Sequence, residues 1–456
     1  MGASLIDYFT DAVLRGPTIG SMLMCLAASL IGVIIFLRKQ SLLGEALSHA
    51  AYPGVIIGVI CAGLILEDDV NDAATAIFIL LGAFCTALLG LVAINWLERG
   101  FKIRTDSALC FALSVFFGIG LTLASDVQFS FPALYRQAQS YLYGQASTMM
   151  DVHIIIYGAL AIVVILTTLL LGKELQTITF NRDFAKSIGM KVSAIDAIIF
   201  ILTALSVVIG IRSVGVVLMS AMLIAPAAAA RQYTNNFHIM LLLAGLFGVI
   251  SGFFGNYISV ELSQYLAIRY PGSRLAMPTG PTIVLVASSI CFLSLLFAPG
   301  RGLLLRLMRV TYFRHRCIRE NILKTLWRFD QDFDRDKNIP FEHILQYQSV
   351  SRLYLHCILL SLIREGWLGK SQSNVYRLTS DGRKKASQIV RLHRLWEVYL
   401  ADYVGIGAER VHHNAEEMEH IITPELEREL TRLLKDPQVD PHRQRIPPMN
   451  ANMDGI

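Results

Sequence analysis

Histidines and glutamates recur at helical spacing near the end of the chain. His393 and Glu397 are four residues apart, so on a helix both side chains leave one face, one turn apart. A second run with such spacing comprises His412, Glu416, Glu419 and His420. Mixed oxygen and nitrogen ligands without a thiolate suit Mn2+ or Fe2+ better than a closed zinc site, although the affinity order does not exclude Zn2+. The pattern predicts a site that senses Mn2+ or Fe2+, with no organic cofactor.

A plainer interpretation of the same residues is open. Arg391 and Arg394 lie beside them, and runs of charge are common on solvated helix faces. The acidic side chains would then form surface salt bridges. Spacing alone does not decide between a metal site and such a face.

The chain that carries these residues has two parts of different polarity. Residues 1–300 hold 30 charged side chains and three histidines, whereas residues 301–456 hold 45 and eight. The first part divides into apolar runs of about 17 to 25 residues, the length that crosses a bilayer core as helix. We expect about nine spans, near residues 17–37, 50–66, 73–96, 107–124, 153–172, 193–211, 213–230, 238–260 and 281–298.

Basic loops predict the orientation of these spans, because Lys and Arg are retained on the cytoplasmic side. Ten of the fifteen Lys and Arg residues in the first part lie in the loops 38–49, 97–106, 173–192 and 231–237. Nine spans with these loops inside place the amino terminus outside and residues after 300 in the cytosol. We therefore expect a multi-pass inner-membrane protein with a cytoplasmic C-terminal region.

A short polar segment between the fifth and sixth expected spans has helix signals. Asn181 is suited to cap the start of a helix and Gly189 to end it. A cytoplasmic helix of about two turns could dock into a cleft of a partner protein. An ordinary connecting loop is the alternative.

Four motifs in order resemble the ABC permease family for manganese, zinc and iron. They are Ser41 to Ala50, Phe180 to Met190, Val214 to Ala227 and Pro278 to Thr282. The resemblance implies a paired permease, a separate cytosolic ATPase and an extracytoplasmic metal-binding protein. It assigns the ATPase coupling loop to Phe180, Asn181, Asp183, Ala185 and Gly189. The family's usual aspartate after the phenylalanine is Asn181 here.

Two further residues are candidates for the permeation path. An imidazole at the mouth of a span, as at His49, is costly unless it is paired, hydrated or functional. Glu45 lies one helical turn earlier, on the same face. Packing and a solvated carboxylate are the alternatives. The nearest approach to a phosphate loop, Gly369-Lys370-Ser371, lacks the required earlier glycine, so no ATP site is expected and the chain is not predicted to be an enzyme.

The second part predicts a winged helix, with two helices, a small β-hairpin and a basic third helix. A generic helical bundle is the alternative. Candidate DNA contacts lie on the second helix and the wing: Ser349, Ser351, Arg352, His356, Lys370 and Arg377. Operator DNA is an expected partner, although a helix with one Lys or Arg offers few contacts to phosphates.

Blocks around His393–Glu397, from Val411 to His420, at Thr423–Glu427 and from Asp440 to Pro447 resemble metal-dependent repressors of the DtxR and MntR type. The resemblance implies primary metal ligands at His393, Glu416, Glu419 and His420, with Glu397 and His412 in supporting or second-site roles. Glutamate at position 416 is typical of the manganese branch. Asn321 and Lys324 stand where that branch has acidic residues, and a protonated lysine cannot ligate a metal.

These observations predict an all-α polytopic membrane domain joined to a soluble winged helix and a helical metal-binding and dimerisation domain. The expected boundaries are 1–300, a basic juxtamembrane linker at 301–316, 317–385, 386–448 and a flexible tail at 449–456. The function expected is an ABC importer permease for divalent metal fused to a metal-dependent repressor, which cutting in the linker could release. Two alternatives are a metal sensor that regulates transport without binding DNA, and a secondary transporter.

Overall fold

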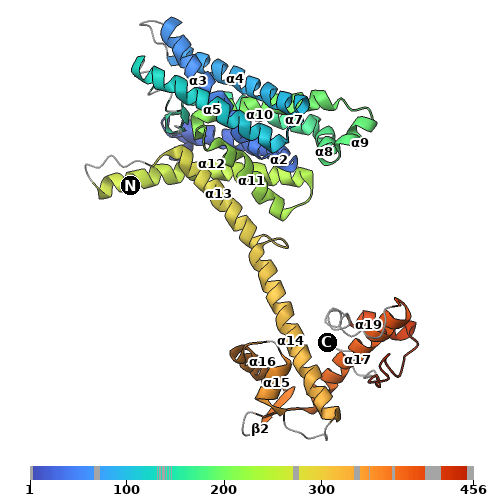
Figure 1. The fold of residues 1–456 in the computed structure, drawn as a ribbon. Coiled ribbons are helices and arrows are strands. Elements are labelled where there is room, and N and C mark those ends of the chain that lie inside the picture. The colour runs from blue at the N-terminus through green and yellow to red at the C-terminus, as the bar shows by residue number, and fades with distance from the viewer. Residues whose placement is uncertain are drawn as a thin grey trace. The chain divides into compact units, whose positions relative to one another are not determined.

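The computed structural model describes residues 4–65, 72–130, 146–270, 277–332, 339–348, 350–371, 375–405 and 423–448, with six single positions between 131 and 145. The chain divides into two compact units, Met1–Arg306 and Leu307–Ile456. Figure 1 follows the elements in chain order.

The first unit is a bundle of helices, in which α2 packs on α12, α7 and α11, and α3 packs on α4 and α5 (Figure 1). Its elements are α1 (Asp7–Thr10), α2 (Arg15–Leu37), α3 (Leu42–Ile65), α4 (Asp72–Gly100), α5 (Thr105–Ser130), η1 (Ala146–Thr148), α7 (Asp151–Leu170), α8 (Gly172–Phe180), α9 (Arg182–Ser187), α10 (Val192–Val214), α11 (Met219–Tyr233), α12 (Phe237–Arg269) and α13 (Thr279–Phe297).

Eight helices among the described residues are long and apolar enough to cross a membrane: α2, α3, α4, α5, α7, α10, α12 and α13. The ninth expected segment, 213–230, is α11, whose 15 residues are shorter than the roughly 20 that a span needs. The helical path is interrupted before α11 at Gly215, where φ is +99°. The amide of the next residue, Val216, donates to the carbonyl of Tyr141 at 3.1 Å. Span parity therefore gives no independent support for the expected orientation.

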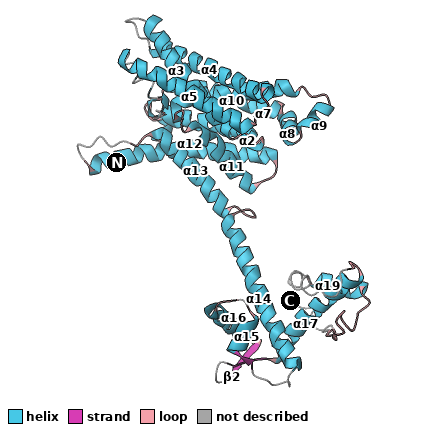
Figure 2. Ribbon diagram, viewed as in Figure 1, coloured by secondary structure: helices cyan, strands magenta, loops and turns pink. Residues whose placement is uncertain are grey.

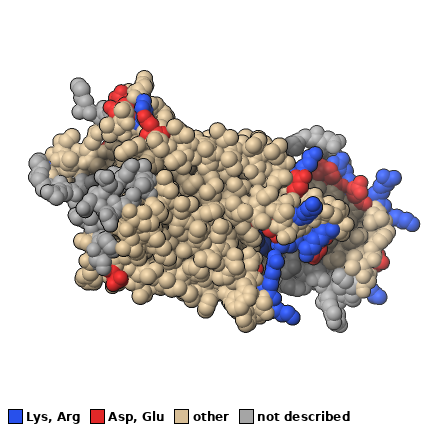
Figure 3. Space-filling model, turned by 90° about the horizontal axis from the view of Figure 1, so that it is seen from above, with Lys and Arg blue, Asp and Glu red and all other residues tan. Residues whose placement is uncertain are grey.

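Glycines allow the helices of this unit to approach closely, as small residues do in membrane bundles. A Cβ on Gly32 would lie 1.8 Å from the carbonyl oxygen of Leu223, so α2 and α11 touch through backbone there. Gly54 of α3 and Gly82 of α4 face each other in the same way, and a Cβ on either would lie 2.1 or 2.3 Å from the other's carbonyl oxygen. Much of the face drawn in Figure 3 carries no charged side chain.

The second unit combines helices with a small sheet, and all described strands of the chain belong to it (Figure 2). Its elements are α14 (Leu303–Asp332, beginning just before the unit), β1 (Ile339–Pro340), α15 (Phe341–Tyr347), α16 (Arg352–Arg364), β2 (Leu368–Ser371), β3 (Val375–Leu378), α17 (Ser380–Asp402) and α19 (Pro424–Leu433). The sheet order is β1-β3-β2, all antiparallel, with Leu368 opposite Leu378 and Ile339 opposite Tyr376.

A buried core joins α14, α16 and the sheet. Its fully buried members include Ile322, Leu323, Leu326, Leu355, Ile358, Leu359 and Tyr376. Helices followed by a hairpin and a further helix were expected from the sequence, and that order of elements is confirmed. The linker expected at 301–316 is helical from Leu303 onward, as the first turns of α14.

Candidate metal and docking sites

The first two expected metal ligands lie on α17. Thr379 caps this helix, since its hydroxyl accepts a hydrogen bond from the amide of Gly382 at 3.0 Å. The four-residue spacing brings His393 Nε2 within 3.1 Å of Glu397 Oε1. Their side chains are 4% and 2% exposed, so this face of α17 is buried rather than solvated.

Lys324 of α14 contacts the other ring nitrogen of His393. Its Nζ atom lies 3.1 Å from His393 Nδ1, and the residue is 4% exposed. An ammonium group can only donate, so Nδ1 accepts, and Nε2 carries the proton that His393 donates to Glu397. A buried row thus runs from ammonium through imidazole to carboxylate. A cavity of about 1070 Å³ opens beside it, with all three side chains in its lining.

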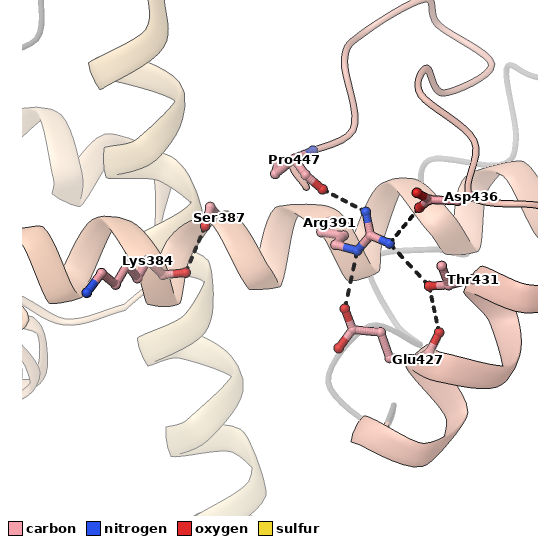
Figure 4. Close-up of polar contacts among 7 residues, drawn as sticks. All are labelled: Lys384, Ser387, Arg391, Glu427, Thr431, Asp436 and Pro447. Carbon is pink, nitrogen blue, oxygen red and sulfur yellow. Dashed lines mark hydrogen bonds and ion pairs between the residues drawn. The ribbon is translucent and has the colours of Figure 1, made fainter. Parts of the chain in front are cut away.

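Arg391 of α17 makes polar contacts with the segment 427–447 (Figure 4). Its guanidinium donates to the carbonyl of Pro447 at 2.8 Å and to Asp436 Oδ1 at 3.0 Å, and lies 3.4 Å from Glu427 Oε1. The Arg391 side chain is 3% exposed. The plainer interpretation, a solvated face of salt bridges, is therefore wrong for this residue.

Arg394 holds the same segment one turn further along α17. Its Nη2 donates to Gln444 Oε1 at 2.6 Å, its Nε lies 3.5 Å from Asp440 Oδ2, and the guanidinium stacks 5.5 Å from the Trp327 ring centroid. Burial lowers the pKa of this guanidinium, while Asp440 and then Glu397 act to raise it. Arg391 and Arg394 thus position the wall of the cavity that faces His393.

Four of the expected ligands lie outside the described residues: His412, Glu416, Glu419 and His420. Within the described residues, no group of three or more His, Cys, Asp and Glu side chains is placed to hold a metal ion. The structure therefore brings His393 and Glu397 together and adds Lys324, and the remainder of the predicted ligand set stays a prediction.

The candidate DNA contacts occupy the start of α16 and the hairpin. Ser351 caps α16, accepting from the amide of Tyr354 at 3.4 Å, and Arg352 pairs with Glu342 at 3.0 Å. His356 on α16, Lys370 on β2 and Arg377 on β3 are exposed. The same face of α16 exposes Leu353, 83% accessible. Ser349 lies outside the described residues.

His49 and Glu45 both lie within α3, one turn apart. His49 is 8% exposed, and its ring packs edge-on against Phe117 with centroids 4.5 Å apart. The Nδ1 atom of His49 is buried and has no hydrogen-bond partner among the described residues. Glu45 is partly buried. A buried ring nitrogen without a partner is available to a passing cation or proton.

The expected docking helix is present as α9. Asn181 caps it, its side chain accepting from the amide of Phe184 at 3.0 Å, and Gly189 follows its end with φ +81°. Ala185 is fully buried, whereas Phe180, Phe184 and Ile188 are each more than half exposed. The exposed apolar side chains of a short helix are suited to insertion into a partner's cleft. Asp183 is exposed and pairs with Lys186.

An ion-pair cluster that the sequence did not predict holds α9 in place. Asp196 of α10 accepts from Arg182 of α9 and from Arg38 at the end of α2, the latter at 2.8 Å. The side chains of Arg38 and Asp196 are 9% and 8% exposed. One signal was available: Asp196 is an acidic residue within an apolar run, where such residues are costly unless paired.

The model of the ABC 3 transport family matches residues 10–298, which cover α2 through α13. The chain belongs to this family. A second model, described as the iron-dependent repressor metal-binding and dimerisation domain, matches residues 379–448. The predicted order of a metal permease followed by a repressor-type domain is confirmed.

Relatives of this chain align with it beyond the region that the ABC 3 model matches. A probable metal transport system membrane protein of Chlamydia trachomatis is 33% identical over 455 residues, covering 98% of this chain and 99% of that protein. The Bacillus subtilis manganese transport system membrane protein MntC is 32% identical over 381 residues, covering 84% and 82%. The structure of PsaBC from Streptococcus pneumoniae with a Fab covers 65% of this chain and 96% of its own, at 27% identity and a TM-score of 0.53.

Proposed function

We propose that the chain is the permease subunit of an ABC importer for Mn2+ or Fe2+, with Zn2+ as a further candidate, and that its C-terminal unit is a metal-dependent transcriptional repressor. The observation that carries the first half is the family match across the whole helical bundle, docking helix included. The match to a repressor metal-binding domain supports the second half.

The importer requires partners that the family implies. A cytosolic ATPase receives α9, and the exposed Phe184 and the following Ile188 enter its cleft. An extracytoplasmic metal-binding protein delivers the ion, and a second permease subunit completes the path. Within the bundle, Glu45 and His49 face the ion during passage. The basic loops after α2, α4 and α7 lie on the cytoplasmic side. We place the second unit on the same side, which requires α11 to cross the bilayer as a ninth, short span.

Transport is tested in proteoliposomes that contain the chain, with and without its ATP-binding partner, by following uptake of radioactive Mn2+. Uptake that requires both ATP and the partner supports an ABC importer. Uptake driven by a proton gradient alone would instead establish a secondary transporter and refute the proposal.

The second unit has two candidate modes of action. The repressor domain match favours DNA binding, whereas the apolar face of α16 and the pairing of Arg352 with Glu342 favour a sensor that regulates transport without DNA. Binding of the full chain to DNA upstream of its own gene is measured with Mn2+, Fe2+ and Zn2+. Metal-dependent binding that Glu416→Ala and His420→Ala abolish supports the repressor; metal binding without DNA binding supports the sensor.

A repressor tethered to a membrane reaches little of the chromosome, so release by cutting near residues 301–316 belongs to the repressor proposal. Immunoblots against the C-terminal unit at high and low metal test it. Only full-length chain under every condition would exclude release and leave the tethered forms.

A further inference from the structure

In the row Lys324–His393–Glu397, both nitrogens of the imidazole contact a charged side chain. A metal ion binds the lone pair of a ring nitrogen, and each nitrogen of His393 is engaged within the protein. Nδ1 accepts from the Lys324 ammonium at 3.1 Å, and the Nε2 proton is held by Glu397 at 3.1 Å. As they stand, these residues do not fit a bound divalent ion.

The lysine also supplies positive charge near Glu397, as a bound metal ion would. Glu397 is buried, and a buried carboxylate needs a compensating charge to be stable. In a metal site the divalent ion provides it. Here the Lys324 ammonium contributes such charge through the imidazole, beside the Arg394 guanidinium, which Glu397 also attracts. A further cation at His393 would be repelled by the ammonium.

We infer that Lys324 is a tethered cation that competes with a divalent metal ion for His393, and so holds α14 against α17 in the metal-free protein. This inference rests on the proposed metal-sensing function. Two further contacts join the same helices, the stacking of Arg394 on Trp327 and the ion pair of Arg383 with Asp330 at 3.0 Å. Ion binding at His393 therefore requires Lys324 to withdraw, which loosens the contact between α14 and α17 instead of tightening it.

The test uses the purified full-length chain in lipid nanodiscs and Mn2+ alone as the probe, with free Mn2+ measured by electron paramagnetic resonance. His393→Ala defines the part of the binding that depends on this ring. Lys324→Met keeps the unbranched apolar part of the side chain and removes the charged terminal group. We expect it to lower the His393-dependent dissociation constant at least about tenfold, the effect of removing one competing interaction of modest strength.

Matched variants separate competition from disturbance of the fold. Lys384→Met removes a lysine of α17 that is 70% exposed, and should leave Mn2+ binding unchanged. Lys324→Arg keeps the charge and should bind Mn2+ as weakly as the wild type. Lys324→Gln, a donor without charge, should fall between and serves in place of the methionine variant if that variant does not fold.

A second measurement reports on the helices. Amide hydrogen exchange in the 318–330 segment of α14 should rise when Mn2+ is added to the wild type, because Lys324 leaves α17, and should not respond in His393→Ala. Equal His393-dependent affinity in wild type and Lys324→Met, or slower exchange with Mn2+, would overturn the inference while leaving a metal sensor intact. No His393-dependent binding in any variant would overturn the sensor as well.

Discussion

Asp196 in the membrane unit and Glu397 in the C-terminal unit are both buried carboxylates, yet they are neutralised differently. Asp196 accepts from two guanidinium groups directly. Glu397 is joined to its cation through an imidazole. Guanidinium groups stay charged and bind carboxylates in a fixed planar geometry, so the first arrangement is a permanent clamp. An imidazole can exchange its partners, so the second can respond to an ion.

The difference fits the roles proposed for the two sites. The clamp joins α9 to the ends of α2 and α10, so under the proposed function a push of the ATPase on α9 would pass to two membrane helices together. The row in the C-terminal unit joins α14 to α17 through the His393 imidazole, which a metal ion could bind instead. A fixed link suits transmission of force, and an exchangeable link suits sensing.

The largest effect is expected from breaking the clamp. Asp196→Asn leaves Arg38, whose side chain is 9% exposed, without a countercharge, and removing one member of a buried ion pair costs about 3–5 kcal/mol. We expect a lower temperature of unfolding in detergent and loss of ATP-driven uptake. For the unfolding temperature alone, the control is Asp183→Asn on α9, whose side chain is 95% exposed. Equal stability of the two variants would show that Asp196 is no clamp.

A smaller effect is expected from Arg391→Met in the C-terminal unit. The arginine is buried, but Asp436 is 59% exposed and can return to water when its partner is lost. Lost charge-assisted hydrogen bonds of this kind cost about 2–3 kcal/mol. Amide exchange across residues 424–447 of the full chain should rise, while Lys384→Met should leave it unchanged. Unaltered exchange in Arg391→Met would mean that the segment is held by apolar packing.

Patterns local in sequence predicted much of the molecule. Apolar length located the spans, and the Asn181 and Gly189 signals located α9, because both depend on neighbours along the chain. The length of α11 was not predictable, since its start depends on Gly215 and on a hydrogen bond to Tyr141, a residue far away in sequence.

Long-range pairing explains what the sequence left out of the candidate sites. Arg38 and Asp196 are 158 positions apart, and Lys324 and His393 are 69 apart. Helical spacing predicted that His393 meets Glu397, but no spacing rule predicts which side chain of another helix approaches the second ring nitrogen. The sequence left open whether Arg391 and Arg394 are surface charges, because their carboxylate partners Glu427 and Asp440 are distant along the chain.

The smallest effect expected is a pH dependence of the stability of α19. A buried and an exposed carboxyl group on this helix contribute to it with opposite signs. Burial raises the pKa of the Glu427 carboxyl above its ordinary value, although Arg391 acts to lower it. Folded protein then binds more protons than unfolded protein, so stability falls as pH rises from the ordinary carboxyl value through the raised one. Glu427→Gln should abolish this fall.

Glu425, in the first turn of the same helix, gives the opposite sign. Hydrogen bonds from its own amide and from Thr423 lower the pKa of its carboxyl, so its contribution is present above the ordinary value and is lost as pH falls through the lowered one. Amide exchange of α19, corrected for intrinsic rates and followed from about pH 7 to about pH 4, where carboxyls titrate, measures both. Glu427→Gln should make protection fall more steeply with acid and Glu425→Gln less steeply. Identical profiles would show that Glu427 is as solvated as Glu425, and that Arg391 holds the segment through Asp436 and Pro447.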